Sequence, residues 1–294
     1  MRDEWQRAFT ARARDYWTDE RTAQLVGDKK PPLLPATAPV LLRAMGLLKQ
    51  DGSLPPNRVR KYRQINHMIL VLQPSLTALC ERFEMVRILD AGCGRSYLTM
   101  LLAWWFAEHQ RHPVQILGVD RSEAMVAECR RRADLAQLQN LTFQACELSE
   151  LTLRDPPNAV ISLHACDTAT DDAIRLGIGA GADFIAVAPC CQAELARGWE
   201  AVSGGPFAPV RGVPHFRRTV AASLTDVMRV VLLRSAGYRA DAMEFVDGNH
   251  TAKNTLIRAI REGEPDGASL DEYRSLVLAT GGVGLRLADD LSSL

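Results

Sequence analysis

The pattern of apolar and polar positions changes near residue 86. Before that point, apolar residues recur at helical spacing between proline-rich breaks, which predicts short helices. After it, short apolar runs alternate with stretches of helical spacing. This alternation is typical of an α/β fold with a mainly parallel sheet covered on both faces. The runs that predict strands cover residues 86–90, 114–120, 141–145, 158–164, 183–188, 241–246 and 255–260.

Proline and glycine mark the boundaries of the predicted helices. Residues 51–56 (DGSLPP) form the clearest linker, and a helix should begin at Asn57 and end or kink at Pro74. Further helices are predicted over residues 97–107, 122–136, 170–176, 225–236 and 270–278.

Three regions follow from these boundaries. We expect an N-terminal helical cap over residues 1–56, a sheet domain over 57–262 and a C-terminal helical tail over 263–294. The last two predicted strands follow each other closely enough to form an antiparallel pair at one end of the sheet.

Charge is segregated along the chain although the total is zero, with 35 basic and 35 acidic residues among 294. Residues 1–75 hold 13 basic and 7 acidic side chains, a net charge of +6, and residues 196–239 hold 7 and 2, a net charge of +5. These basic segments flank an acidic centre. They either form a patch for a polyanion or cover solvated helix faces.

Composition restricts the class of protein. A hydrophobic fraction of 47% with 24% charged residues excludes wholesale disorder, and seven cysteines, an odd number, indicate reduced thiols. The longest fully apolar run, Met100 to Ala107, is far shorter than the about 20 residues of a bilayer span. The N-terminus has no signal-peptide core, so we expect a cytoplasmic protein without membrane contact.

The strongest motif is Ile88-Leu89-Asp90-Ala91-Gly92-Cys93-Gly94. Two glycines after a strand let a ligand approach the backbone, and the next helix offers free N–H groups. A dinucleotide fingerprint would have a third glycine near the helix start, where this chain has Arg95-Ser96-Tyr97. Asp90 would repel a pyrophosphate, but it suits a cationic amino group.

Two more carboxylates follow later strands. Asp120 ends the second predicted strand and can accept both hydroxyls of a ribose. Glu147 comes just beyond the third strand, where its side chain would lie at the edge of an adenine ring. Each carboxylate alone is more typical of a solvated turn, but the ordered set favours a nucleoside site.

These motifs resemble the class I S-adenosylmethionine-dependent methyltransferases. ILDAGCG is similar to their first motif, GVDRS to their second, and the strand order with a terminal antiparallel pair to their fold. The resemblance covers about residues 65–262 and implies a Rossmann-like, doubly wound seven-stranded sheet with S-adenosylmethionine as cofactor. The positions it assigns to the cofactor are Asp90, Gly92, Gly94, Asp120, Arg121, Glu147 and His164.

A narrower resemblance involves LHACDTATD, APCCQ and HTAKN. These segments look like the methyltransferase domain shared by acceptor-stem tRNA 2′-O-methyltransferases and little-characterised methyltransferase-like proteins. Asp167 stands where glycine is frequent in that pattern. Methyl transfer needs a general base only when the acceptor must lose a proton, and His164 and Asp167 are the candidates. His164 could equally be a strand-end histidine satisfied by the backbone.

The carboxyl ends of the strands also suggest how an acceptor is bound. The predicted substrate-binding residues are Cys190, Arg217, Arg218, His250 and Lys253. Further phosphate-contact candidates are Arg58, Arg60, Lys61, Arg63 and Arg211, and the candidates for stacking on a base are Phe207, His215 and Phe216.

The Cys190-Cys191 pair has three interpretations. An activated thiolate could add to a pyrimidine, but two thiols that pack at a strand end are the interpretation we favour. Zinc binding with His164 would strain two adjacent cysteines, so we expect no metal.

The favoured function is methyl transfer from S-adenosylmethionine to an oxygen or nitrogen of RNA, tRNA included. One alternative is a methyltransferase for a protein or small molecule. Another is a catalytically silent cofactor-binding module in a ribonucleoprotein assembly.

Overall fold

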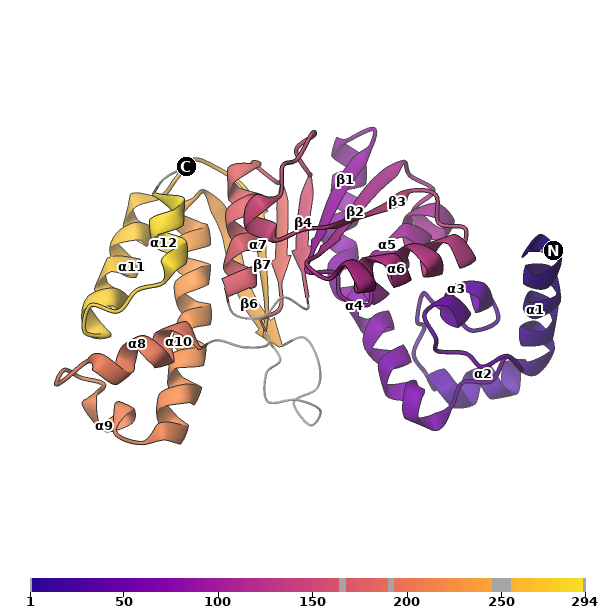
Figure 1. Ribbon diagram of the computed structural model, residues 1–294, viewed down its shortest axis with the longest axis horizontal. Helices are drawn as coiled ribbons and strands as arrows, with labels where there is room; N and C mark the ends of the chain where they lie inside the picture. The colour runs from indigo at the N-terminus through magenta and orange to yellow at the C-terminus, as the bar shows by residue number, and fades with distance from the viewer. Residues whose placement is uncertain (1, 164–167, 190–192, 245–254, 293–294) are drawn as a thin grey trace. The chain divides into compact units, whose positions relative to one another are not determined.

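The structure is a computed structural model that describes residues 2–163, 168–189, 193–244 and 255–292. Its strands form one seven-stranded sheet in the order β3-β2-β1-β4-β5-β7-β6 (Figure 1). The strands are β1 (Val86–Ala91), β2 (Val114–Asp120), β3 (Leu141–Ala145), β4 (Ala159–Ser162), β5 (Phe184–Val187), β6 (Tyr238–Glu244) and β7 (Thr255–Arg261).

The pairing confirms the predicted α/β fold. β1 runs parallel to β4, with Asp90 opposite Ile161, and β4 runs parallel to β5. Every residue of β4 and β5 is buried, as expected for parallel strands covered on both faces. β7 pairs antiparallel with both β5 and β6, which confirms the predicted terminal pair.

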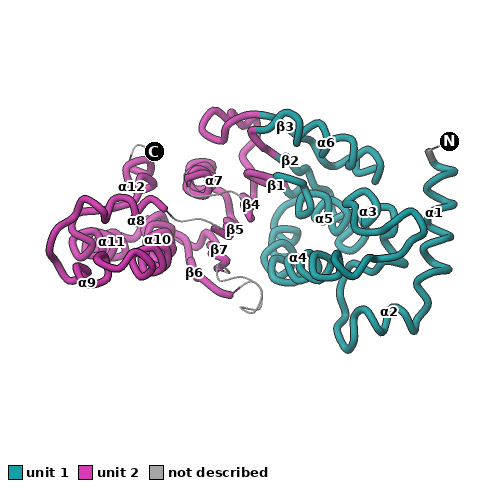
Figure 2. The backbone as a smooth tube through the Cα atoms, turned by 60° about the horizontal axis from the view of Figure 1, so that its bottom comes forward, with its two compact units in different colours: residues 1–86, 94–118, 122–145 teal, residues 87–93, 119–121, 146–294 magenta. Residues whose placement is uncertain are grey.

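The chain divides into two compact units, coloured separately in Figure 2. Unit 1 comprises residues 1–86, 94–118 and 122–145, and unit 2 comprises residues 87–93, 119–121 and 146–294. The predicted regions 1–56, 57–262 and 263–294 stay predictions.

Unit 1 contains the N-terminal helices and the helices that follow β1 and β2. They are α1 (Arg2–Tyr16), α2 (Asp19–Val26), α3 (Pro39–Ala44), α4 (Pro56–Arg82), α5 (Tyr97–Trp105), the π-helical segment η1 (Phe106–Gln110) and α6 (Glu123–Leu135). Ser122 caps α6 because its hydroxyl accepts from the N–H of Met125 at 3.3 Å.

Helix α4 continues through Pro74 to Arg82, so of the two predicted effects of this proline, an end or a kink, the end is wrong. A proline inside a helix costs about 3 kcal/mol because its ring removes a donor and crowds the preceding turn. Beyond it, Leu76 and Leu79 are buried on the face that also buries Leu72. The burial of these two leucines offsets the cost and keeps the helix intact.

Unit 2 contains the remaining helices. They are η2 (Leu148–Glu150), α7 (Thr168–Gly179), α8 (Glu194–Gly198), η3 (Trp199–Ala201), α9 (Ala208–Arg211), α10 (Pro214–Ser235), α11 (Gly267–Ala279) and α12 (Arg286–Leu291). α10 starts eleven residues before the predicted helix over 225–236. Pro214 in its first turn has the fixed φ that suits a helix start.

Candidate functional site

Within unit 2, the ends of neighbouring strands are joined by backbone hydrogen bonds. The N–H of Cys93, in the glycine loop, donates to the carbonyl of Val119 at 2.8 Å. The N–H of Cys146 donates to the carbonyl of Asp120 at 3.2 Å. The loop after β1 is therefore joined to the end of β2, and the end of β2 to the residue after β3.

The same edge continues across β4 and β5. Ser162 Oγ donates to the carbonyl of Ala91 at 2.8 Å, and the N–H of Ala188 donates to the carbonyl of Ser162 at 2.9 Å. Ser162 was not a candidate in the sequence, because a serine inside an apolar run carries no chemical signal. It joins the carboxyl ends of three strands.

Three predicted cofactor residues lie along this edge in unit 2. Asp90 is 3% exposed near the end of β1, Asp120 is half-buried at the end of β2, and Glu147 is exposed just after β3. Arg121 is exposed next to Asp120. The three carboxylates therefore follow three neighbouring strands, β1, β2 and β3, in their order across the sheet.

The loop after β1 needs its glycines. Gly92 has φ +70° and Gly94 has φ +50°, in the left-handed region that strains residues with a Cβ. Ser96 also has a left-handed φ of +55° and is fully buried immediately before α5. Ser96 was not a site candidate in the sequence analysis, since non-glycine residues seldom adopt this conformation.

In unit 1, α6 holds the second half of this loop. Cys129 Sγ donates to the carbonyl of Gly94 at 3.1 Å, and an Arg132 guanidinium N–H donates to the carbonyl of Arg95 at 3.4 Å. The Lys61 ammonium lies 4.8 Å from the centre of the Tyr97 ring. Burial lowers the pKa of Lys61, and the charge of Arg95 lowers it further.

Five predicted site residues lie outside the described residues, and their roles stay predictions. They are His164, Asp167, Cys190, His250 and Lys253. Within the described residues, no group of three or more histidine, cysteine or acidic side chains is arranged to hold a metal ion. The expectation that the chain binds no metal is untested, because two of the weighed ligands, His164 and Cys190, are among those five.

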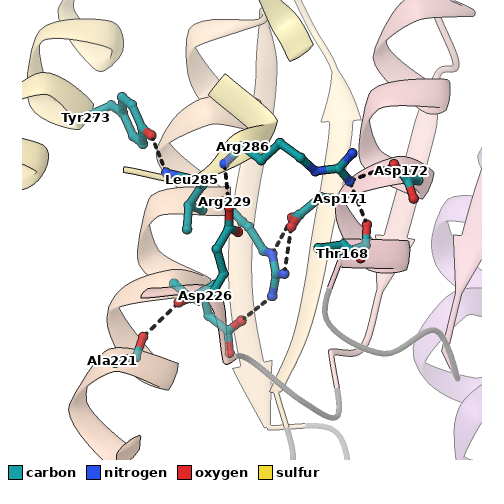
Figure 3. A network of polar contacts seen from close by, with 11 residues as sticks. Thr168, Asp171, Asp172, Ala221, Asp226, Arg229, Tyr273, Leu285 and Arg286 are labelled. Carbon is teal, nitrogen blue, oxygen red and sulfur yellow. Dashed lines mark hydrogen bonds and ion pairs between the residues drawn. The ribbon is translucent and has the colours of Figure 1, made fainter. Parts of the chain in front are cut away.

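A buried ion network supports the first turn of α7, directly after residues 164–167 (Figure 3). Asp171, fully buried, accepts from Arg229 Nε at 2.7 Å and from Arg229 Nη2 at 3.2 Å. Arg229 Nη1 also donates to Asp226 at 3.2 Å. Burial lowers the pKa of Arg229, but the hydrogen bond and charge of Asp171, together with Asp226, outweigh it and raise that pKa.

A second, more exposed pair adds to this network. Arg286 Nη2 lies 2.9 Å from Asp172 Oδ1, so α12 contacts the same turn of α7 (Figure 3). The sequence motif included Asp171, but not its partner Arg229, which is 58 residues away and has no local signal.

Helix α10 begins at the end of the sheet where β6 ends (Figure 1). β6 and β5 are both antiparallel to β7, so they run in the same direction, and α10 runs opposite to the β6 that follows it. The 22 residues of α10 span about 33 Å, against about 23 Å for the seven residues of β6. The first turns of α10 therefore extend roughly 10 Å past the strand.

These first turns carry part of the predicted substrate surface. Phe216 is 55% exposed, with its ring centre 5.6 Å from that of His215, and Arg218 is exposed beside it. Arg217 is only half-exposed, and its Nη2 lies 2.7 Å from Glu200 Oε1. Both arginines lie on α10.

Several other candidates for RNA contact form contacts within the protein instead. Arg211 is buried and donates to the carbonyl of Gly204, which makes it wrong as a phosphate contact. Phe207 stacks on Trp199, with ring centres 5.3 Å apart, so that face of its ring is covered. Arg58 donates to the carbonyl of Gly46.

The comparisons with known proteins agree with this geometry. Residues 60–198 match the family model described as a methyltransferase domain. This stretch is a methyltransferase domain. The seven-stranded sheet with a terminal antiparallel pair is the sheet that the resemblance to class I S-adenosylmethionine-dependent methyltransferases implies. The narrower resemblance to acceptor-stem tRNA enzymes stays a prediction.

Individual proteins also match parts of this chain. A glutathione S-transferase C-terminal domain-containing protein homolog from Drosophila pseudoobscura pseudoobscura is 28% identical over 152 residues, which are 50% of this chain and 23% of that protein. This chain thus spans about a quarter of that relative's length.

Two solved structures are similar over larger parts of the chain. Magnesium protoporphyrin IX methyltransferase from Synechocystis PCC 6803, solved with bound S-adenosylmethionine, has 17% identity and a TM-score of 0.42, covering 86% of this chain and 97% of that one. An rRNA methylase from Streptococcus thermophilus has 13% identity and a TM-score of 0.39, covering 60% and 87%.

S-adenosylmethionine is the cofactor of class I methyltransferase domains, and the described residues fit it. Gly92 and Gly94 have φ angles that would strain a residue with a Cβ, and without side chains they leave the loop backbone open to a ligand. Asp90 supplies a buried carboxylate for an ammonium group, and Asp120 a half-buried one for ribose hydroxyls. In the part of the chain described here, no helix is both long enough and apolar enough to cross a bilayer.

Proposed function

We propose that this chain transfers a methyl group from S-adenosylmethionine to an oxygen or nitrogen atom of RNA. The observation that carries the RNA acceptor is the exposed start of α10, which extends past the carboxyl ends of the strands in unit 2. In doubly wound sheets, ligands bind beyond those strand ends.

The cofactor contacts follow from the edge of unit 2. Asp90 holds the amino group of the methionine part, Asp120 accepts the two ribose hydroxyls, and Glu147 bounds the adenine. Gly92 and Gly94 allow the backbone to approach the ligand, and Arg121 flanks the ribose. The bound sulfonium supplies an already activated methyl group, so the chain's main task is to position the acceptor. Positioning alone can supply about 7–11 kcal/mol.

The start of α10 suits a nucleic acid for two physical reasons. The exposed Phe216 ring, with His215 against it, offers a face on which a base can stack, and base stacking on an aromatic ring contributes about 1–3 kcal/mol. The Arg218 guanidinium beside this ring can pair with a phosphate, with Arg217 in support. Cys190, His250 and Lys253 complete the proposed acceptor surface.

His164 and Asp167 are the proposed general bases for an acceptor that must lose a proton. We expect His164→Ala to lower kcat by about 10²–10⁴-fold and to change the Kd for S-adenosylmethionine much less. Single-turnover methylation and calorimetric titration measure the two effects separately. Equal losses of turnover and cofactor affinity would assign His164 to binding or folding instead.

Reversing the charge of Arg217 and Arg218 tests the acceptor surface. The Arg217→Glu/Arg218→Glu variant should bind RNA at least about tenfold more weakly and reduce the salt slope of log Kd by about 1.4, the value for two lost phosphate contacts on a single strand. Arg218→Glu alone should cause most of this loss, because Arg217 already pairs with Glu200.

The matched control for this variant is Arg154→Glu/Arg274→Glu, which makes the same charge change at exposed positions of unit 2. It should stay within about twofold of the unaltered chain in an electrophoretic mobility titration, since neither arginine lies at the start of α10. Equal losses in both variants would argue against a specific patch.

The acceptor class is tested by offering labelled S-adenosylmethionine and a cell extract to the chain. We expect the transferred label to become soluble after ribonuclease treatment and to resist protease. Label that only protease releases, or label in the small-molecule fraction, would replace RNA with another acceptor. Cofactor binding without transfer to any fraction would make the chain a silent binding module.

A further inference from the structure

Unit 1 contains a pocket of about 300 Å³ between the end of α2, residues 29–31 and one face of α4. Leu25 and Leu70 belong to its apolar lining, and the basic side chains of Lys29, Lys30 and Arg63 also line it. Among the described residues, the pocket is lined only by residues from 25 to 70, so it shares no residue with the proposed cofactor site at Asp90 and Asp120 in unit 2.

Buried hydrogen bonds build the wall of this pocket. Asn66 Oδ1 accepts from the N–H of Leu33 at 2.9 Å, and its Nδ2 donates to the carbonyl of Leu33 at 3.2 Å. The Tyr62 hydroxyl donates to the same carbonyl at 2.6 Å. Because all three side chains are buried, this clamp fixes the Lys29-Lys30-Pro31 segment against α4.

Arg63 closes the other side. Its Nη2 donates to the carbonyl of Leu25 at 3.3 Å, which ties α4 to the last turn of α2. Leu70 is 47% exposed at the pocket, an unusual position for a large apolar side chain. The pocket is therefore a fixed part of the fold with accessible apolar surface.

The chemistry of the lining selects an anion with an apolar part. Lys29, Lys30 and Arg63 carry positive charge there, and none of the described residues that line the pocket is acidic. The surrounding region is also basic, since residues 1–75 hold 13 basic and 7 acidic side chains, a net charge of +6. A volume near 300 Å³ is at the small end for ligand pockets and suits a single ring system.

We propose that this pocket binds one nucleotide of single-stranded RNA. The base lies on the apolar lining against Leu25 and Leu70, and the flanking phosphates pair with Lys29 and Lys30. The inference deepens the proposed function, on which it rests, because it gives the RNA substrate a second anchor in the N-terminal helices. It also gives these helices a role in RNA recognition that does not require contact with the cofactor.

The test measures binding of the full chain to a fluorescein-labelled 12-nucleotide single-stranded RNA by anisotropy at several salt concentrations. Lys29→Glu/Lys30→Glu should raise the Kd at least about tenfold and reduce the salt slope by about 1.4. The matched control is Arg14→Glu/Lys49→Glu, the same charge change at exposed positions outside the pocket. It should raise the Kd by less than about twofold.

A second variant separates the base from the phosphates. Leu70→Ser removes apolar surface at an exposed position, so it should weaken RNA binding at least about threefold and leave binding of inorganic polyphosphate unchanged. RNA binding that is unaffected by Leu70→Ser would overturn the proposal, as would equal losses in the two charge-reversed pairs. Tighter binding of a labelled acidic, leucine-containing peptide than of RNA would also overturn it and assign the pocket to a protein partner.

The same variants distinguish this inference from the proposed function. If the Lys29→Glu/Lys30→Glu variant methylates RNA with an unchanged KM for RNA, the proposed nucleotide pocket is refuted and the proposed function stands. If RNA binding depends on the pocket residues but the chain does not methylate RNA, the nucleotide pocket stands and the proposed function is refuted.

Discussion

An Arg229→Met variant is expected to lose about 3–5 kcal/mol of unfolding free energy. The Arg229 side chain is 1% exposed and Asp171 fully buried, and they are joined by hydrogen bonds of 2.7 and 3.2 Å. Removal of the guanidinium leaves Asp171 buried without its cationic partner, and Asp226 loses the same partner. Urea denaturation followed by circular dichroism measures the loss.

Arg239→Met is the matched control. Arg239 pairs with Glu262 at 2.6 Å, but the two side chains are 58% and 49% exposed. Water screens this pair, so its loss should lower the unfolding free energy far less than Arg229→Met does. Similar losses in the two variants would show that the Asp171–Arg229 pair is not an energetically important feature of unit 2.

A double-mutant cycle isolates the pair itself. Asp171→Leu/Arg229→Met should lose less than the sum of the two single variants, with a coupling energy of about 0.5–3 kcal/mol. The reason is that each single variant removes one member of a buried ion pair and leaves the other charge in place, whereas the double variant removes both charges of the Asp171–Arg229 pair. Strict additivity would contradict a direct interaction.

The second large effect is expected at Asp120. Asp120→Ala should weaken S-adenosylmethionine binding at least about 100-fold, because two hydrogen bonds to a charged carboxylate contribute about 1.5–3 kcal/mol each. Asp120 is half-buried at the end of β2, next to the hydrogen bond from Cys146, so its position is fixed by the strand edge. Isothermal titration calorimetry measures the Kd directly.

Asp155→Ala serves as the control for a lost carboxylate, since Asp155 is an exposed residue of unit 2 away from the strand ends. It should bind the cofactor like the unaltered chain. Asp120→Asn should bind with intermediate affinity, because the amide keeps one acceptor and loses the charge. An unchanged Kd in Asp120→Ala would remove this residue from the cofactor site.

The sheet could be predicted from the sequence because its strands are short apolar runs with clear borders. β2 and β3 match their predicted ranges at both ends, and the glycine loop follows β1 as expected. Burial of both faces makes such strands continuous apolar segments, and this local signal needs no knowledge of the partner strand.

The errors arose where distant contacts override a local pattern. Pro74 indicated a helix end or a kink, and α4 does not end there because buried leucines beyond it keep the chain helical. Arg211 and Phe207 had the composition of an RNA-binding segment, yet the fold buries the first and stacks the second on Trp199. Arg229 was invisible because its partner Asp171 lies 58 residues earlier. Ion pairs between distant elements leave no periodicity in the sequence.

The central claim is that a sulfonium nucleoside binds where the edge of unit 2 brings together Asp90, Gly92 and Asp120. The most direct measurement is a crystal structure of the chain grown with S-adenosylmethionine. The account predicts density for the cofactor with both ribose hydroxyls within hydrogen-bond distance of the Asp120 carboxylate, and the methionine amino group on the Asp90 side. Cofactor density elsewhere on the chain, or a nicotinamide dinucleotide retained in its place, would contradict it.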